Sequence, residues 1–216
     1  LAHQTEALNA LLPALRDNNR VTAIMACGTG KTLLALWVAE RSAASTILVL
    51  VPSLALLRQT LHEWLHETNW PSLAYLCVCS DPTVSDELDP LSAQQSDLDF
   101  AVSTESRNVR DFLDSKFDGI KIVFSTYQSA RVVAGGMKRG EVLDLAVFDE
   151  AHKTAGKQGR NSSFALEDVN LAIRKRFFLT ATPRHYNPRQ RTADGDKQLV
   201  FSMDRPEVYG PTAYRL

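Results

Sequence analysis

A glycine-rich stretch, MACGTGKT, begins at Met25 and has the residue types that bind the phosphates of a nucleotide. Gly28 and Gly30 allow the backbone to turn and to bring its N–H groups against phosphate oxygens. Lys31 would reach the β- and γ-phosphates, and Thr32 would bind Mg²⁺. The strict motif G-x-x-x-x-G-K-[ST] begins with glycine, where this sequence has Met25. We therefore predict a phosphate-binding loop with one departure from the motif.

Two adjacent carboxylates, Asp149 and Glu150, follow the apolar run LDLAVF. Ligands of parallel sheets bind outside the carboxyl ends of the strands, so a strand here would carry both side chains to such a site. Asp149 would hold Mg²⁺ and Glu150 would polarise an attacking water. The distance in sequence from Lys31 leaves room for several strand–helix units between the two signals.

A different chemistry is indicated by HEWLH, in which His62, Glu63 and His66 fit the zinc-protease pattern H-E-x-x-H. Two histidines four residues apart share a helix face, and the glutamate beside them would activate a metal-bound water. The extended form of the pattern fails, because Asn69 and Ser72 stand where glycine and histidine are required.

The other option for a third zinc ligand is Glu87, which lies in SDPTVSDELDP, a stretch typical of a loop. On a helix over 53–67, His62 and His66 lie in line with Arg58, so a solvated polar face explains both histidines. The apolar stripe of that helix is formed by Leu54, Leu57, Leu61 and Leu65. We keep the zinc protease as a remote alternative.

Short apolar runs alternate with helical spacing along the chain. Continuous apolar strands separated by helices imply an α/β fold with a mainly parallel sheet and helices on both faces. We predict strands at 21–27, 46–51, 73–79, 120–126, 143–150 and 176–182, and helices at 31–43, 53–67, 105–116 and 162–173.

Residues 80–118 interrupt this alternation with ten acidic and three basic residues. This composition predicts a solvated surface insertion that contains one short helix. Residues 184–198 are polar and rich in arginine, which predicts a loop.

The bulk composition is that of an ordinary globular protein. The chain has 216 residues and a net charge of −1, so any site for a polyanion must be a local patch. No apolar run approaches the ~18 residues of a membrane span. The three cysteines, Cys27, Cys77 and Cys79, do not form a disulfide framework, which favours a reducing cytoplasm.

With these motifs the chain resembles, over nearly its whole length, the first RecA-like domain of superfamily 2 helicases of the DEAH-box group. MACGTGKT resembles motif I, and VPSLALLRQT resembles motif Ia. FSTYQS resembles the small motif between Ia and II, DEAH is motif II, and TATP resembles motif III. The five signals occur in the family's order.

The resemblance implies ATP and Mg²⁺ as cofactors, and Lys31, Asp149, Glu150 and His152 as catalytic groups. The nucleotide would be bound by Gln4, Cys27, Gly28, Thr29, Gly30, Lys31 and Thr32, with Thr32 and Asp149 holding the metal. Nucleic acid would be contacted by Pro52, Ser53, Arg58, Thr126, Tyr127 and Gln128. The state of the nucleotide would be coupled to the nucleic-acid groove by His152, Thr180, Ala181 and Thr182.

The spelling of the motifs resembles motors of large bacterial proteins that carry restriction nuclease or methyltransferase modules. That implies a cytoplasmic bacterial protein, double-stranded DNA as the partner, and translocation as the activity. We expect residues 1–183 to form the ATP-binding domain and 184–216 to lead toward a second RecA-like domain that this sequence lacks. Because such motors hydrolyse ATP between two domains, we expect little activity from this chain alone.

Two further functions compete with the motor. A nucleotide-gated nucleic-acid-binding module would need no motor activity, although Lys31 and Glu150 are both present. A small-molecule P-loop kinase would have no use for the motif Ia, DEAH and TATP stretches.

Overall fold

An eight-stranded sheet forms the centre of the molecule, for which the computed structural model describes residues 2–79, 101–157, 161–186 and 200–216. The strands lie in the order β10-β1-β8-β6-β2-β5-β3-β4, and each neighbouring pair is parallel. Their bounds are β1 Arg20–Ile24, β2 Thr46–Val51, β3 Leu73–Val78, β4 Val102–Ser103, β5 Ile120–Thr126, β6 Leu143–Phe148, β8 Ile173–Thr180 and β10 Thr212–Arg215. A second, antiparallel pair joins β7 Gly156–Lys157 to β9 Val200–Phe201.

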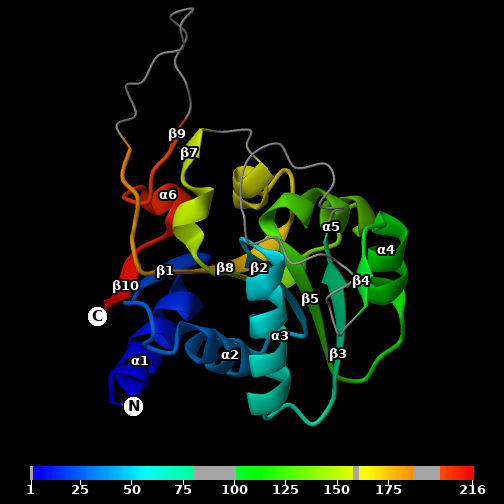
Figure 1. The fold of residues 1–216 in the computed structure, drawn as a ribbon, viewed down its shortest axis with the longest axis horizontal. Helices are drawn as coiled ribbons and strands as arrows, with labels where there is room; N and C mark the ends of the chain where they lie inside the picture. Colours follow the sequence, from blue (N-terminus) through cyan, green and yellow to red (C-terminus); the bar gives the residue numbers. More distant parts are fainter. Residues whose placement is uncertain (1, 80–100, 158–160, 187–199) are drawn as a thin grey trace, which may run out of the picture.

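Helices cover both faces of this sheet. Figure 1 shows the first three helices on one face and the next two on the other. The α-helices are α1 Ala2–Asp17, α2 Lys31–Arg41, α3 Leu54–Glu67, α4 Ser106–Asp114, α5 Ala130–Gly136 and α6 Pro206–Tyr209. Short 3-10 helices are η3 Tyr127–Ser129, η4 Ala151–Thr154 and η5 Asn161–Leu166. The predicted α/β fold with a parallel sheet is confirmed.

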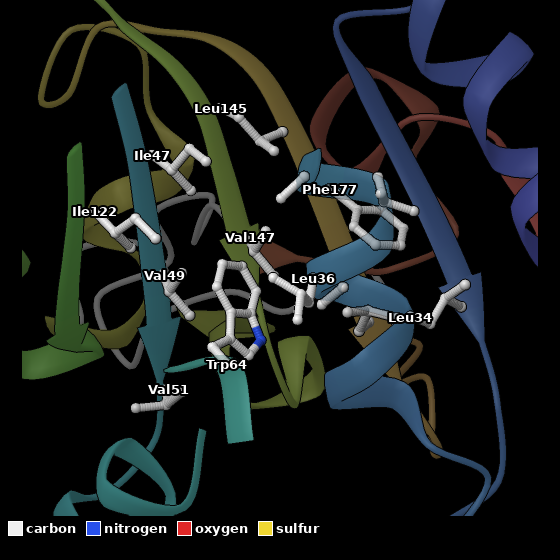
Figure 2. Close-up of a cluster of buried hydrophobic side chains, with 14 of the residues drawn as sticks. Leu34, Leu36, Ile47, Val49, Val51, Trp64, Ile122, Leu145, Val147 and Phe177 are labelled. Carbon is white, nitrogen blue, oxygen red and sulfur yellow. The ribbon is translucent and has the colours of Figure 1, made fainter. Parts of the chain in front are cut away.

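Strand periodicity sorts the apolar side chains into two cores. Along β2, Ile47, Val49 and Val51 pack on the α2 and α3 face, while Leu48 and Leu50 pack on the α5 face, because successive side chains of a strand point to opposite faces. Burial on both faces explains why the strand is apolar throughout. In Figure 2, Trp64 of α3 packs against the first of these cores, among side chains from β2, β6 and α2.

Helix α1 and strand β10 are among the elements that the sequence analysis did not predict. Helix α1 buries Ala7, Leu11 and Leu15 at the spacing of one helix face. Strand β10 pairs with β1 near the C-terminal end of the chain, so the sheet extends past residue 183, where we expected the domain to end.

The helix predicted at 162–173 is wrong. The segment begins with η5, continues in turns, and enters β8 at Ile173. The reason lies in Arg176, which is buried and donates hydrogen bonds to the carbonyl oxygens of Ala165, Leu171 and Ile173. Those carbonyls are paired with a guanidinium, so the segment does not need the backbone ladder of an α-helix.

Part of the predicted acidic insertion belongs to the fold. Strand β4 joins the edge of the sheet, and α4 packs on α5 through the fully buried Val109. Residues 80–100 and 187–199 lie outside the described residues. None of the helices in the described part of the chain is long and apolar enough to cross a membrane.

Candidate nucleotide and nucleic-acid site

The predicted functional segments follow five neighbouring strands. The order β1-β8-β6-β2-β5 places their carboxyl ends side by side at one edge of the sheet, since all five strands are parallel. The segments that follow them are MACGTGKT after β1, TATP at the end of β8, DEAH after β6, VPS at the end of β2, and TYQ at the end of β5. The structure thus brings together segments that are far apart in sequence.

The loop between β1 and α2 has the backbone of a phosphate cradle. Gly28 and Gly30 have φ angles of +76° and +80°, which glycine adopts without the steric cost of a Cβ. A Cβ at Gly30 would also overlap the amide nitrogen of Gln4. Gly30 is the N-cap of α2, so the free N–H groups of the helix N-terminus lie at the loop. Cys27 is exposed on the same loop.

The side chain of Lys31, the first residue of α2, folds back into this loop. Its Nζ is 3.4 Å from the carbonyl oxygen of Met25 and 3.3 Å from that of Ala26. It is also 3.7 Å from Oε1 of Glu150. The ammonium is buried, and these oxygens together offset the loss of its hydration. A bound phosphate would be a stronger partner for the ammonium than neutral carbonyls.

Helix α1 places two side chains on the outer part of the loop. Nε2 of Gln4 donates a hydrogen bond to the carbonyl oxygen of Thr29 over 3.2 Å, and Nε2 of His3 lies 3.1 Å from the same oxygen. Gln4 is buried, and His3 is a contact that the sequence analysis missed. The position of His3 next to Gln4 was the only hint in the sequence that it could contact the loop, and that position does not determine where the ring points.

The two acidic groups after β6 have different surroundings. Asp149 is 8% exposed and accepts a hydrogen bond from the backbone N–H of Glu150. Burial and the nearby Glu150 carboxylate raise the pKa of Asp149 to about 6. Glu150 is partly exposed and adopts a left-handed backbone with φ of +48°. A buried carboxylate beside a second one is a setting that a cation stabilises.

These residues fit a magnesium ion and a triphosphate. Magnesium prefers oxygen ligands and is commonly held by one or two carboxylates, a hydroxyl, substrate phosphates and water. Asp149 offers the carboxylate, and Thr32 offers a hydroxyl from the first turn of α2, directly after Lys31. No group of three or more His, Cys, Asp or Glu side chains lies close enough to hold a metal among the described residues. Such a site would therefore depend on the nucleotide for its remaining ligands.

A polar chain connects Glu150 to the segment after β8. Nδ1 of His152 lies 3.3 Å from Oε2 of Glu150 and 3.1 Å from Oγ1 of Thr180. Thr180 Oγ1 accepts a hydrogen bond from the backbone N–H of Thr182. Burial lowers the pKa of His152, which keeps the imidazole neutral at neutral pH. The predicted coupling residues His152, Thr180 and Thr182 are therefore in contact, and Ala181 lies between the two threonines.

The six predicted nucleic-acid contacts divide into two groups. Arg58 and Gln128 are exposed, and Pro52 and Ser53 are half-buried at the start of α3, where Ser53 Oγ caps the helix by accepting from the N–H of Leu56. These four side chains are accessible from the edge of the sheet.

Thr126 and Tyr127 are buried, which corrects their expected place on that face. Oγ1 of Thr126 is hydrogen-bonded to Oγ of Ser129. The hydroxyl of Tyr127 donates to the carbonyl oxygen of Asp149 over 2.6 Å. Burial and the charge of Asp149 raise the pKa of Tyr127, so the hydroxyl remains a donor. The buried part of the run that ends in TYQ therefore extends through Tyr127, and Gln128 is its first exposed residue.

The zinc pattern lies on the surface of α3. His62 and His66 are exposed, and Nδ1 of His66 is 2.8 Å from Oε1 of Glu67. Burial and the charge of Glu67 raise the pKa of Glu63. The third ligand suggested by the sequence, Glu87, lies outside the described residues. Within the described residues the pattern is a polar helix face, as the periodicity predicted.

Comparison with known proteins decides the family. A family model described as "Type III restriction enzyme, res subunit" matches residues 1–185. The chain belongs to this family. The chain is also 30% identical over 213 residues to "Probable helicase A859L" of African swine fever virus. That match covers 99% of this chain but 21% of the viral protein, so the chain spans about a fifth of that relative.

Solved structures of related proteins share the fold of this chain. It is similar to an "ATP-dependent Type ISP restriction-modification enzyme LlaBIII bound to DNA", with a TM-score of 0.79, 31% identity, and coverage of 99% of this chain and 15% of that one. A nuclease-deletion mutant of the Type ISP enzyme LlaGI, in complex with a DNA substrate mimic, gives a TM-score of 0.71 at 29% identity, covering 99% of this chain and 19% of that one. The Pyrococcus furiosus Hef helicase domain shares the fold, with 18% identity and a TM-score of 0.56. That match covers 97% of this chain and 37% of the Hef chain.

Proposed function

We propose that this chain is the ATP-binding half of a motor that hydrolyses ATP to move on double-stranded DNA. The observation that carries the proposal is the contact series from Lys31 to Glu150 to His152 to Thr180. It joins the phosphate loop, the acidic segment and the segment after β8 at one edge of the sheet. A binding module without hydrolysis would not need a carboxylate in this position.

Each group has a role in the proposed reaction. The loop N–H groups and Lys31 bind the phosphates, and Asp149 with Thr32 holds Mg²⁺, which offsets phosphate charge when bound. Glu150 accepts a proton from the attacking water, and its contacts with Lys31 and His152 orient its carboxylate. Nδ1 of His152 contacts both Glu150 and Thr180, so a displacement of either segment alters the contact with the other.

Duplex DNA is proposed as the polymer. The support is the similarity to two enzymes that were solved with DNA or a DNA mimic, together with accessible polar groups at the ends of β2 and β5. A second RecA-like domain is proposed as the partner that closes over the nucleotide. The small share of the relatives that this chain spans leaves room for it.

The test compares ATP hydrolysis by the complete protein with duplex DNA, single-stranded DNA and RNA. We expect duplex DNA to raise the rate most. The 216-residue chain alone should bind ATP and Mg²⁺ weakly and hydrolyse little ATP with any polymer. Vigorous hydrolysis by the isolated chain would contradict the need for a second domain. Binding of nucleotide and DNA by the complete protein without hydrolysis would favour the binding module.

A further inference from the structure

The peptide group between Asp149 and Glu150 is fixed by hydrogen bonds at both of its polar atoms. Its carbonyl oxygen accepts from the hydroxyl of Tyr127 over 2.6 Å. Its N–H donates to Oδ1 of Asp149 over 2.9 Å. A buried peptide held at both ends cannot rotate without losing a bond that water does not replace. One of the two bonds comes from a side chain that directly follows a different strand, β5.

Glu150 needs such support because of its backbone conformation. Its φ of +48° and ψ of +46° are left-handed, a conformation that is sterically unfavourable for a residue with a Cβ. Strain of this kind persists where the surrounding structure over-determines it. In this conformation the carboxylate lies 3.7 Å from Nζ of Lys31 and 3.3 Å from Nδ1 of His152. A relaxed backbone would carry the carboxylate away from both.

Tyr127 reaches this peptide from the end of β5, with β2 lying between β5 and β6. It opens η3, whose next residue is the exposed Gln128. A hydrogen bond between Thr126 and Ser129 closes the same turn. The residue whose hydroxyl holds the Asp149 carbonyl therefore directly precedes Gln128, which lies on the surface proposed to meet DNA.

Packing alone does not explain a tyrosine at this position. The ring lies against Phe148, with centroids 6.2 Å apart, and belongs to the core on the α5 face. A phenylalanine would supply the same ring contacts without burying a hydroxyl. Burial of the hydroxyl costs desolvation free energy, and the hydroxyl donates its hydrogen bond to the Asp149 carbonyl. The specific effect of tyrosine is therefore exerted on that peptide.

We propose that Tyr127 is a positioning residue that holds the Asp149–Glu150 peptide and so orients the Glu150 carboxylate, linking the DNA-facing turn after β5 to ATP hydrolysis. The inference rests on the proposed function, because it requires Glu150 to act on the attacking water. It adds a residue that touches neither nucleotide nor DNA in this role.

Tyr127→Phe in the complete protein tests the proposal. With duplex DNA present, we expect kcat for ATP hydrolysis to fall about tenfold or more, because small misplacements of a reacting group cost one to two orders of magnitude in rate. KM for ATP should change less than twofold, since the phosphate loop is untouched. The matched control is Tyr209→Phe, because Tyr209 lies in the same core and its hydroxyl is bonded to Oγ1 of Thr154. That variant should keep kcat within twofold.

Replacement of Tyr127 by 4-aminophenylalanine or 4-fluorophenylalanine separates donation from packing, and it serves also if Tyr127→Phe fails to fold. The amino group can donate to the Asp149 carbonyl and should restore at least half of kcat, whereas the fluorine cannot donate and should not. Equal kcat for both replacements, or an unchanged kcat in Tyr127→Phe, would overturn the proposal. A parent protein without ATP hydrolysis would instead overturn the proposed function.

Discussion

The indole N–H of Trp64 donates a hydrogen bond to the carbonyl oxygen of Thr32 over 3.1 Å. Trp64 lies on α3, which follows Pro52 and Ser53 and carries Arg58, three of the predicted DNA contacts. Thr32 lies in the first turn of α2, beside the phosphate loop. The ring is 1% exposed and packs edge-on against Phe124 of β5. One side chain thus ties two helices to the sheet next to the candidate site.

Removal of that ring should destabilise the domain strongly. We expect Trp64→Ala to lower the free energy of unfolding by about 3–5 kcal/mol, because it leaves a cavity as well as losing apolar burial. Trp64→Phe should cost less, since it keeps an aromatic ring and loses the hydrogen bond. Urea unfolding followed by circular dichroism measures both. His66→Ala on the exposed face of α3 is the control and should stay within about 0.5 kcal/mol of the parent. A small effect of Trp64→Ala would show that the two helices are held elsewhere.

Arg176 should be essential to the segment before β8. Its guanidinium donates to three backbone carbonyls and is paired with Asp168, and burial lowers its pKa to about 10. Arg176→Met leaves those carbonyls without their donor, so we expect a loss of about 3 kcal/mol or more in unfolding free energy.

The same strand offers the control for that change. Arg174 is two residues earlier, and 68% of its side chain is exposed. Its Nη2 lies 4.0 Å from Oδ1 of Asp144. Arg174→Met should cost at most about 1 kcal/mol, as is usual for an exposed ion pair. Similar losses in the two variants would contradict the assigned role of Arg176.

Acid should weaken the domain partly through Asp144. Its Oδ2 accepts four hydrogen bonds from the backbone and hydroxyl groups of Ser45 and Thr46. Burial acts to raise the pKa of Asp144, but these hydrogen bonds outweigh it and lower the pKa. A folded-state pKa below the unfolded one stabilises the protein above the unfolded value of about 3.9, and this stability is lost as pH falls through the folded-state value.

Asp144→Asn isolates that contribution. We expect it to lower the free energy of unfolding by about 1–2 kcal/mol at pH 7 and to flatten the dependence on pH below about pH 4. Thermal unfolding across pH 2–7, about the range over which carboxylates titrate, provides the measurement. The control is Asp17→Asn at an exposed position, which should keep the free energy of unfolding at pH 7 within about 0.5 kcal/mol of the parent. A parallel shift of the whole profile by Asp144→Asn would mean that the carboxylate charge does not matter.

Zinc should be absent from the α3 surface. With His62 and His66 exposed on a polar helix face, we expect the purified protein to contain far less than one zinc per chain. Elemental analysis of the parent and of His66→Ala measures this. A full equivalent of zinc that disappears in the variant would revive the protease hypothesis.

Local sequence patterns were sufficient where local physics decides the structure. The apolar run 46–51 and the glycines at 28 and 30 predicted a strand and a phosphate loop, because burial on two faces and positive φ leave a clear mark in sequence. The grouping of the motif segments along one edge then follows from parallel strands.

Contacts between distant segments were not predictable. The position of Arg176 in the sequence does not reveal that its guanidinium donates hydrogen bonds to backbone carbonyls in residues 165–173. A helix, in which backbone N–H groups would bond these carbonyls, was therefore predicted there. The inward direction of Tyr127 and its bond to Asp149 depend on the order β6-β2-β5, which only the folded sheet defines. Strand β10 is short and follows residues without periodicity, so its pairing with β1 left no local signal.

The central claim is that Lys31 and Glu150 bind and hydrolyse ATP at this edge of the sheet. The most direct measurement is ATP binding and DNA-dependent hydrolysis by the complete protein and by Lys31→Ala and Glu150→Gln. We predict that Lys31→Ala loses both binding and hydrolysis, whereas Glu150→Gln binds ATP about as tightly as the parent and hydrolyses it at least ~100-fold more slowly. Hydrolysis by Glu150→Gln at the parent's rate would contradict the account.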